Sequence, residues 1–250
     1  MSKMALLVID MQEDFCEPVC SLHIVVRRCG VGPDPRMLTA FVQSGALAVQ
    51  GSRDTASVIN KLLKLPCKIK YGTMDSHPSD HCSFASQHPN ASPFTSSHTI
   101  KNPFGGDEEQ TTTLWPDHCV QGTFGEQRIP EIDWESVEAM FKKGMDKRVE
   151  SYSGFGPPFR NPRVQPSELQ QSLETGGVET VVVVGLAFDY CVKHTALDAA
   201  KAGFETYVVE DASRAVHNSE KELARTREDL RAHGVQVISS QDEVLRSMAG

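Results

Sequence analysis

The sequence predicts an α/β fold in which a central, mostly parallel six-stranded sheet lies between two layers of helices. Short apolar runs alternate with helical patterns along most of the 250 residues, and this alternation is typical of a parallel sheet with helices on its faces. Four consecutive valines at 181–184 suit a strand that is covered on both sides. Hydrophobic residues make up 39% of the chain, which is enough for one large core, so we expect a single domain over residues 1–250.

Six short apolar runs are the expected strands: residues 5–9, 68–73, 139–142, 180–184, 206–209 and 235–238. Helical patterns cover residues 55–63, 167–175, the alanine-rich segment 192–202 and the charged segment 219–233. Glycines follow the last three of these segments and are expected to end them. Residues 17–50 and 75–132 show no clear period, and loops of this length in a compact domain are usually functional or disordered.

Composition excludes several classes of partner. The formal net charge is -8, so no basic field would attract a phosphate backbone, and we expect a small-molecule substrate instead of nucleic acid. The apolar run at 5–9 is too short for a signal peptide or a membrane span. Seven cysteines are an odd number, which favours reduced thiols and a cytoplasmic protein over a disulfide framework.

Cys191 is the candidate nucleophile. It follows the valine strand and precedes the alanine-rich helix, so it should lie near a helix N-terminus. The positive end of the helix dipole and a nearby cation can lower a thiol pKa from about 8.5 to roughly 3.5–7.5. On position alone, a small buried hydrophobic residue is an equally good interpretation.

A candidate metal site begins where the second strand ends. Asp75 and His77 are two residues apart, so their side chains should lie on the same side of an extended chain, and His118 could supply a third ligand. Two histidines and one carboxylate with open positions suit a catalytic Zn²⁺, Fe²⁺ or Mn²⁺ ion. Aspartate and histidine are also ordinary turn residues, so this spacing alone is a weak signal.

Two further charged residues end strands. Asp10 follows the first apolar run and Lys143 follows the third. Alone, the aspartate would usually be a helix or turn cap and the lysine a solvated surface residue. Together with Cys191, however, they place a carboxylate, an ammonium and a thiol at one edge of a parallel sheet, where open α/β sheets bind their ligands.

The ordered motifs resemble the nicotinamidase branch of the isochorismatase-like hydrolases. The motifs are Val8-Ile9-Asp10-Met11-Gln12-Glu13-Asp14-Phe15-Cys16, Asp75-x-His77-Pro78, Leu114-Trp115-Pro116-x-His118-Cys119, Lys143-Gly144, Tyr152-Ser153-Gly154-Phe155 and Gly185-Leu186-Ala187-x-Asp189-Tyr190-Cys191. The resemblance covers nearly the whole chain, and it implies an isochorismatase-like hydrolase fold.

The resemblance also implies roles for individual residues. Asp10, Lys143 and Cys191 match the family's catalytic triad, and Asp75 and His77, with His118, match its metal ligands. In some members a histidine matching His81 also approaches the metal. Phe15, Trp115 and Tyr152 match the family positions that form the walls of the pyridine pocket. A cis peptide in the oxyanion turn would fall at Ala187-Phe188, next to the backbone N–H of Cys191.

The implied activity is a metal-dependent hydrolysis of nicotinamide to nicotinate and ammonia, through a cysteine thioester, in NAD salvage. The implied cofactor is one divalent metal ion, for which we expect Zn²⁺, with Fe²⁺ or Mn²⁺ as alternatives. Another amidase or carbamoyl hydrolase of the superfamily, which would lack the full metal set, is the second hypothesis. A non-catalytic metal-binding scaffold is the third. The sequence is compatible with a homo-oligomer and gives no sign of a membrane partner.

One segment departs from the family pattern. About 25 extra residues, at about 19–43, separate the first motif from the Gly45-Ala46-Leu47 turn. We expect a surface insertion whose ends lie close together, because the family joins them almost directly and an exposed loop costs little closure entropy. Its Cys20, His23 and Cys29 could join Cys16 in a second metal site, but the spacing lacks a second tight cysteine pair.

Overall fold

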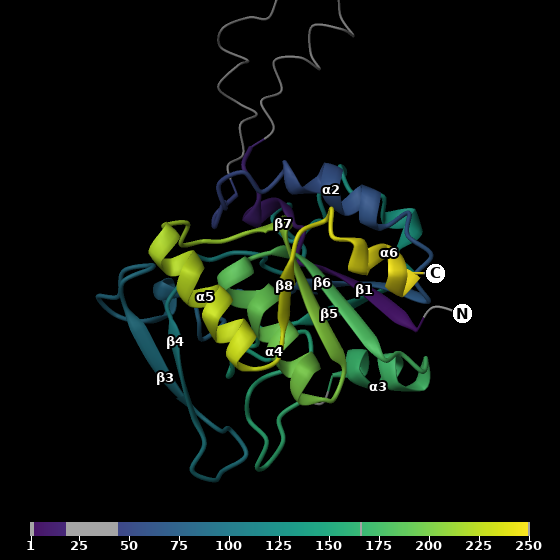
Figure 1. Ribbon diagram of the computed structural model, residues 1–250. Helices are drawn as coiled ribbons and strands as arrows, with labels where there is room; N and C mark the ends of the chain where they lie inside the picture. Colours follow the sequence, from purple (N-terminus) through teal and green to yellow (C-terminus); the bar gives the residue numbers. More distant parts are fainter. Residues whose placement is uncertain (1–2, 19–44, 166, 250) are drawn as a thin grey trace, which may run out of the picture.

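The computed structural model describes residues 3–18, 45–165 and 167–249. Within these residues, the main sheet has six strands in the order β5-β2-β1-β6-β7-β8, and each neighbouring pair is parallel. The predicted three-layer α/β/α fold is therefore confirmed (Figure 1). The expected insertion at 19–43 lies outside the described residues.

The sheet strands are β1 (Met4–Ile9), β2 (Ile69–Asp75), β5 (Ala139–Lys143), β6 (Thr180–Leu186), β7 (Glu205–Arg214) and β8 (Gln236–Ile238). The α-helices are α2 (Thr55–Leu62), α3 (Glu168–Thr175), α4 (Lys193–Lys201), α5 (Glu220–Ala232) and α6 (Glu243–Ala249). Shorter helical turns are η1 (Glu13–Phe15), η2 (Ala85–Gln87), η3 (Trp134–Ser136) and the π-helix η4 (Phe188–Val192). An antiparallel hairpin contains β3 (Ser97–Lys101) and β4 (Glu109–Thr113).

Side chains of β1 alternate between two hydrophobic cores, one on each face of the sheet. Leu6 and Val8 pack in the core that includes Ile59 of α2 and Leu245 of α6. Ala5, Leu7 and Ile9 pack in the opposite core with residues of α3, α4 and α5. All six residues of β1 are buried, which explains why its sequence is continuously apolar. Figure 1 shows α2 and α6 on one side of the sheet and α3, α4 and α5 on the other.

The starts of two helices are determined by serine side chains. Ser167 and Ser219 cap α3 and α5, because each side-chain oxygen accepts a hydrogen bond from a backbone N–H in the first turn.

Strand β7 runs five residues beyond the predicted 206–209. The prediction stopped at the charged pair Glu210-Asp211, but the strand continues to Arg214 and buries Ala212.

The non-periodic segment 75–132 is ordered, although it contains little of the main sheet. It forms the β3–β4 hairpin, which lies apart from the main sheet in Figure 1, and a series of turns. The sequence predicted neither this hairpin nor α6. Among the described residues, no helix combines the length and the apolar character needed to cross a membrane.

The described residues on either side of the expected insertion contact each other. The backbone N–H of Val49 donates to the carbonyl oxygen of Phe15 at 3.0 Å, and that of Leu47 donates to Asp14 at 2.9 Å. The Glu17 N–H donates to the Ser52 hydroxyl at 3.1 Å. The chain before residue 19 and the chain after residue 44 are therefore held together independently of the segment between them.

Candidate active site

Three neighbouring strands bring Asp10, Asp75 and Lys143 to one edge of the sheet. In the register of β2 and β5, Asp75 lies directly opposite Lys143. Asp10 follows the last residue of β1, and its backbone N–H donates to Thr73 of β2 at 3.2 Å. All three side chains are at least 90% buried. The parallel topology therefore creates this charge cluster from residues far apart in the sequence.

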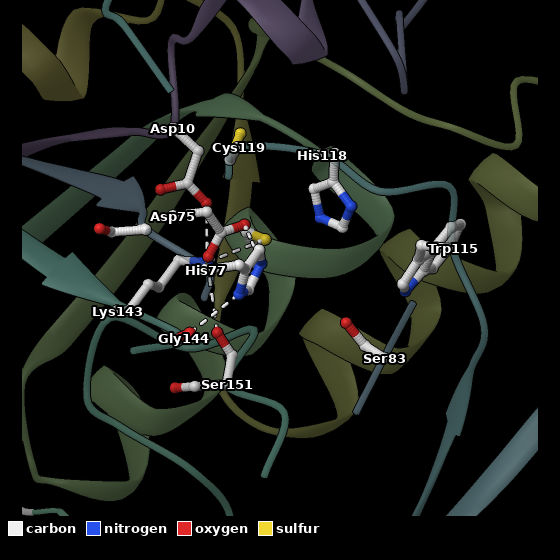
Figure 2. Close-up of polar contacts among 12 residues, drawn as sticks. Asp10, Asp75, His77, Ser83, Trp115, His118, Cys119, Lys143, Gly144 and Ser151 are labelled. Atoms are coloured by element: carbon white, nitrogen blue, oxygen red, sulfur yellow. Dashed lines mark hydrogen bonds and ion pairs between the residues drawn. The ribbon is translucent and has the colours of Figure 1, made fainter. Parts of the chain in front are cut away.

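Lys143 is the centre of the cluster (Figure 2). Its Nζ lies 2.9 Å from Asp10 Oδ2 and 2.6 Å from Asp75 Oδ1. It also lies 3.4 Å from Cys191 Sγ and 3.3 Å from the carbonyl oxygen of Ser151. The other carboxylate oxygen of Asp10 accepts a hydrogen bond from the Thr73 hydroxyl at 2.7 Å. Lys143 thus contacts both other members of the predicted triad, and a carboxylate oxygen of Asp10 lies within 4.8 Å of Cys191 Sγ.

Burial and charge act in opposite directions on this cluster. Burial raises the pKa of Asp10 above its ordinary value, and the attraction of Lys143 only partly offsets that rise. Burial lowers the pKa of Lys143, but Asp10 and Asp75 outweigh burial and hold it well above its usual range. The lysine is therefore charged, and Asp10 is a stronger base than an exposed aspartate.

Cys191 lies in the π-helix η4, immediately before α4. The predicted lowering of its pKa is wrong. Burial raises the pKa of the thiol well above its usual range, and Asp10 and Asp75 raise it further, which outweighs the opposite effect of Lys143. The helix-dipole argument failed because it ignored both the burial and the two nearby carboxylates.

The cis peptide bond lies one position earlier than predicted. It joins Leu186 to Ala187, whereas the expectation was Ala187-Phe188. Ala187 begins the turn, and its carbonyl oxygen accepts hydrogen bonds from the backbone N–H groups of Tyr190 and Val192, both at 3.0 Å. Phe188 is buried in the core with residues of α4 and α5, so its side chain anchors the turn to that core.

Asp75, His77 and His118 form a group whose potential ligand atoms lie within 4.8 Å of one another. Nδ1 of His77 pairs with the Gly144 carbonyl oxygen at 2.9 Å, and Nδ1 of His118 pairs with the Pro116 carbonyl oxygen at 2.7 Å. A carbonyl can only accept, so each Nδ1 carries the proton and each Nε2 offers a lone pair. Nε2 of His77 is buried without a hydrogen-bond partner. This donor set fits a divalent metal ion.

His81 does not belong to that group. Its Nδ1 lies 2.8 Å from the Ser83 hydroxyl and its Nε2 lies 3.1 Å from the Val149 carbonyl oxygen. Because the carbonyl can only accept, Nε2 carries the proton and both ring nitrogens are used within the protein. Its ring packs against His77 with centroids 4.2 Å apart. The geometry favours a supporting role for His81 over metal ligation.

A narrow cavity opens between the charge cluster and an aromatic wall. Cys191, Asp75 and His118 line one part, together with Ala187. The predicted wall residues all line it too: Phe15, Trp115 and Tyr152. Tyr190, Leu47 and Val216 complete the apolar lining. The cavity is thus bounded by flat rings, by the Cys191 thiol and by two members of the candidate metal group, Asp75 and His118.

Glu150 also lines this cavity, and the sequence did not predict it. Only 2% of the residue is exposed, and one carboxylate oxygen accepts a hydrogen bond from the Ser151 backbone N–H at 2.7 Å. Its negative charge contributes to raising the pKa of His77, which Asp75 raises more strongly and which ends above its ordinary value despite burial. Glu150 also acts to raise the pKa of His118, but burial outweighs it and lowers that pKa to about 4. The sequence offered one indication of this role: Glu150 lies two residues before Tyr152, a predicted wall residue. The segment has no periodicity that would predict the direction of its side chains.

Comparisons with known proteins agree with this geometry. The family model described as "Isochorismatase domain" matches residues 95–242, which is more than half of the chain. A nicotinamidase of Acinetobacter baylyi is 37% identical over 202 residues, which cover 81% of this chain and 88% of that protein.

Two solved structures share the fold. The yeast nicotinamidase bound to the inhibitor nicotinaldehyde has a TM-score of 0.79 and 29% identity, covering 94% of this chain and 99% of that one. The pyrazinamidase of Pyrococcus horikoshii in complex with zinc has a TM-score of 0.63 and 26% identity, covering 95% and 99%. Because the domain model matches more than half of the chain and a relative above 30% identity matches over most of both chains, the chain belongs to the isochorismatase family of hydrolases.

Proposed function

We propose that the protein hydrolyses nicotinamide to nicotinate and ammonia and serves in NAD salvage. One observation carries the proposal: a single cavity joins Cys191, a candidate metal group and an aromatic wall. The thiol suits attack on an amide carbonyl, and the rings suit a planar heterocycle. The nicotinamidases among its relatives are similar over most of the chain.

The proposed reaction begins with proton transfer from Cys191 to Asp10. Burial raises the pKa values of both groups, so the thiol keeps its proton until a substrate arrives and the carboxylate has enough basicity to take it. The ammonium of Lys143, 3.4 Å from the sulfur, stabilises the resulting thiolate. The thiolate then attacks the amide carbon and forms a tetrahedral intermediate.

Breakdown of that intermediate releases ammonia. Backbone N–H groups of Ala187 and Cys191 are proposed to stabilise the oxyanion, and the loss of one such donor typically costs about 3–4 kcal/mol. Asp10 returns its proton to the departing nitrogen, which leaves a thioester on Cys191. Asp10 then activates a water molecule that hydrolyses the thioester and frees nicotinate.

Asp75, His77 and His118 are proposed to hold one divalent ion, which would bind the pyridine nitrogen and orient the ring. Zn²⁺ is the proposed ion, with Fe²⁺ or Mn²⁺ as alternatives. The orphaned Nε2 of His77 supports a metal here, and the zinc complex of the pyrazinamidase relative supports the choice of zinc. Phe15 and Trp115 would pack against the ring.

The test measures ammonia released from nicotinamide by the purified protein, with and without chelator, alongside elemental analysis. We expect turnover that falls when the metal is removed. Asp10→Asn should lose nearly all turnover, because an amide can neither take the thiol proton nor return it. Release from other amides that chelator does not affect would indicate the second amidase hypothesis. No release from any amide would indicate a scaffold.

The proposed compartment is the cytoplasm. Support comes from the odd number of cysteines in the sequence and from the free thiols among the described residues, which are Cys16, Cys67, Cys82, Cys119 and Cys191. Disulfides are typical of proteins in oxidising compartments, whereas these five thiols are all unpaired. Titration of the protein isolated without reductant should find seven free thiols. Fewer thiols would count against the assignment.

A further inference from the structure

A buried threonine lies behind the aromatic wall of the cavity. Thr112 belongs to β4 of the hairpin and is 2% exposed. Its hydroxyl oxygen lies 2.6 Å from the Tyr152 hydroxyl oxygen. The same Tyr152 oxygen accepts a hydrogen bond from Trp115 Nε1 at 2.9 Å. Two rings of the cavity wall and one strand of the hairpin therefore meet at a single phenol oxygen.

The direction of these hydrogen bonds follows from the groups involved. An indole N–H can only donate, so Trp115 donates to Tyr152. Thr112 could be donor or acceptor, but its hydroxyl also lies 3.3 Å from the carbonyl oxygen of Thr113, which can only accept. The assignment that satisfies every proton is a chain from Trp115 through Tyr152 and Thr112 to Thr113. In it, Thr112 supplies the acceptor for the tyrosine proton.

The hydrogen-bond chain restricts the orientation of the Trp115 and Tyr152 rings more than their packing contacts alone do. Tyr152 stacks on His194 with centroids 5.3 Å apart, and the rings of Trp115 and Tyr190 are nearly perpendicular with centroids 4.9 Å apart. Such contacts allow a ring to slide or tilt within its plane of contact. The shared hydrogen bonds fix the distance and angle between the two rings. Without the Thr112 hydroxyl, the buried phenol would have to turn to find another acceptor.

We propose that Thr112 is a positioning residue that holds Trp115 and Tyr152 in the orientation that binds the substrate ring. The inference rests on the proposed function for the identity of that substrate. Thr112 contacts none of Asp10, Lys143 and Cys191. It therefore acts on substrate binding through the wall, and not on the steps that make or break covalent bonds.

The main experiment compares Thr112→Val with the wild-type enzyme for nicotinamide hydrolysis. Valine keeps the branched shape of threonine and replaces the hydroxyl with a methyl group, which can neither donate nor accept a hydrogen bond. We expect KM for nicotinamide to rise by about 3- to 10-fold, the loss typical of one buried hydrogen bond, while kcat stays within about twofold. The inhibition constant for nicotinate should rise by the same factor, because it reports binding without chemistry. Thr112→Ser should restore both values.

A matched control comes from the neighbouring residue on the same strand. Thr111 is exposed, and its hydroxyl pairs with Thr99 across the hairpin at 3.0 Å. Thr111→Val should leave both constants unchanged. In a Tyr152→Phe background, Thr112→Val should have no further effect on KM, because the hydroxyl through which it acts is gone. Unchanged KM in Thr112→Val, an equal loss of kcat, or full additivity with Tyr152→Phe would overturn the proposal.

An NMR measurement separates this inference from the proposed function. The sequence has two tryptophans, and the indole N–H of Trp134 donates to the Ile129 carbonyl oxygen instead. Thr112→Val should move the Trp115 indole resonance and leave that of Trp134 in place. If the wild-type protein releases no ammonia from nicotinamide, the proposed function is wrong, and the indole resonance alone decides whether Thr112 orders the wall. An unmoved Trp115 signal would refute the inference in either case.

Discussion

Replacing Lys143 with methionine would leave two buried carboxylates without their cation. The side chain of Lys143 is 4% exposed, and those of Asp10 and Asp75 are 0% and 5% exposed. Methionine has nearly the same length and keeps the packing of the aliphatic stem. The substitution therefore removes mainly the positive charge, at a point where water cannot replace it.

The structure gives the size of the effect. At an effective dielectric constant of about 20, each of the two ion pairs represents a gross attraction of about 6 kcal/mol. Desolvation of the ammonium offsets most of this, and breaking a buried pair typically costs about 3–5 kcal/mol. We expect the free energy of unfolding to fall by that amount in the metal-free protein. The loss should be smaller with metal bound, because Asp75 then keeps a cation.

The assay is urea unfolding at pH 7, with and without chelator, and the adjacent lysine provides the control. Lys142 pairs with Glu126 at 2.9 Å, but its side chain is 49% exposed, and such surface pairs contribute only about 0–1 kcal/mol. Lys142→Met should therefore change stability little. Equal losses in the two variants, or a metal-free Lys143→Met protein as stable as the wild type, would refute the argument from buried charge.

Cys191→Ala should abolish ammonia release while the protein still folds and binds metal; release above background would mean another nucleophile. His118→Ala should lower the bound metal and raise KM for nicotinamide, and full metal occupancy by elemental analysis would show that His118 is not a ligand. Burial lowers the pKa of His194 from 6.5 to about 4, so below pH 6.5 the unfolded chain binds a proton that the folded chain does not, and stability falls as the pH decreases towards 4. His194→Gln should lose less unfolding free energy than the wild type between pH 7.5 and pH 5, and equal losses would contradict this. Replacing residues 19–43 with a short Gly-Ser link should preserve cooperative unfolding and measurable kcat, because the chain on either side is already hydrogen-bonded together; failure to fold would place the segment in the core.

Sequence reasoning worked best where one physical rule determines position. The ends of β1, β2 and β5 could be placed because apolar runs stop at charged residues, and parallel topology then brings Asp10, Asp75 and Lys143 to one edge. The resemblance to a known family added Phe15 and Trp115, whose positions in the cavity no periodicity indicates. The proximity of residues far apart in the sequence could be predicted here, because each of them lies at the end of a regular strand or within a family motif.

The parts that could not be predicted depend on details that a pattern does not carry. Glu150 lies in a segment without regular structure, so nothing in the sequence places its carboxylate in the cavity. The pKa of Cys191 depends on how completely the thiol is buried and on two carboxylates brought in by other strands. The hairpin of β3 and β4 is rich in threonine and charged residues, and its role became visible only when Thr112 was found beside Tyr152.

The hydrogen bond from His77 to Gly144 limits what protein engineering can do at this site. Gly144 has a φ of +67°, and a Cβ atom there would lie 2.3 Å from Cε1 of His77 and 2.6 Å from its Nδ1. Any side chain would push the imidazole away from the position in which it faces Asp75 and His118. Saturation mutagenesis at 144 should therefore recover only glycine among variants that keep their metal. Libraries intended to change the substrate range should vary the aromatic wall and leave this backbone carbonyl untouched.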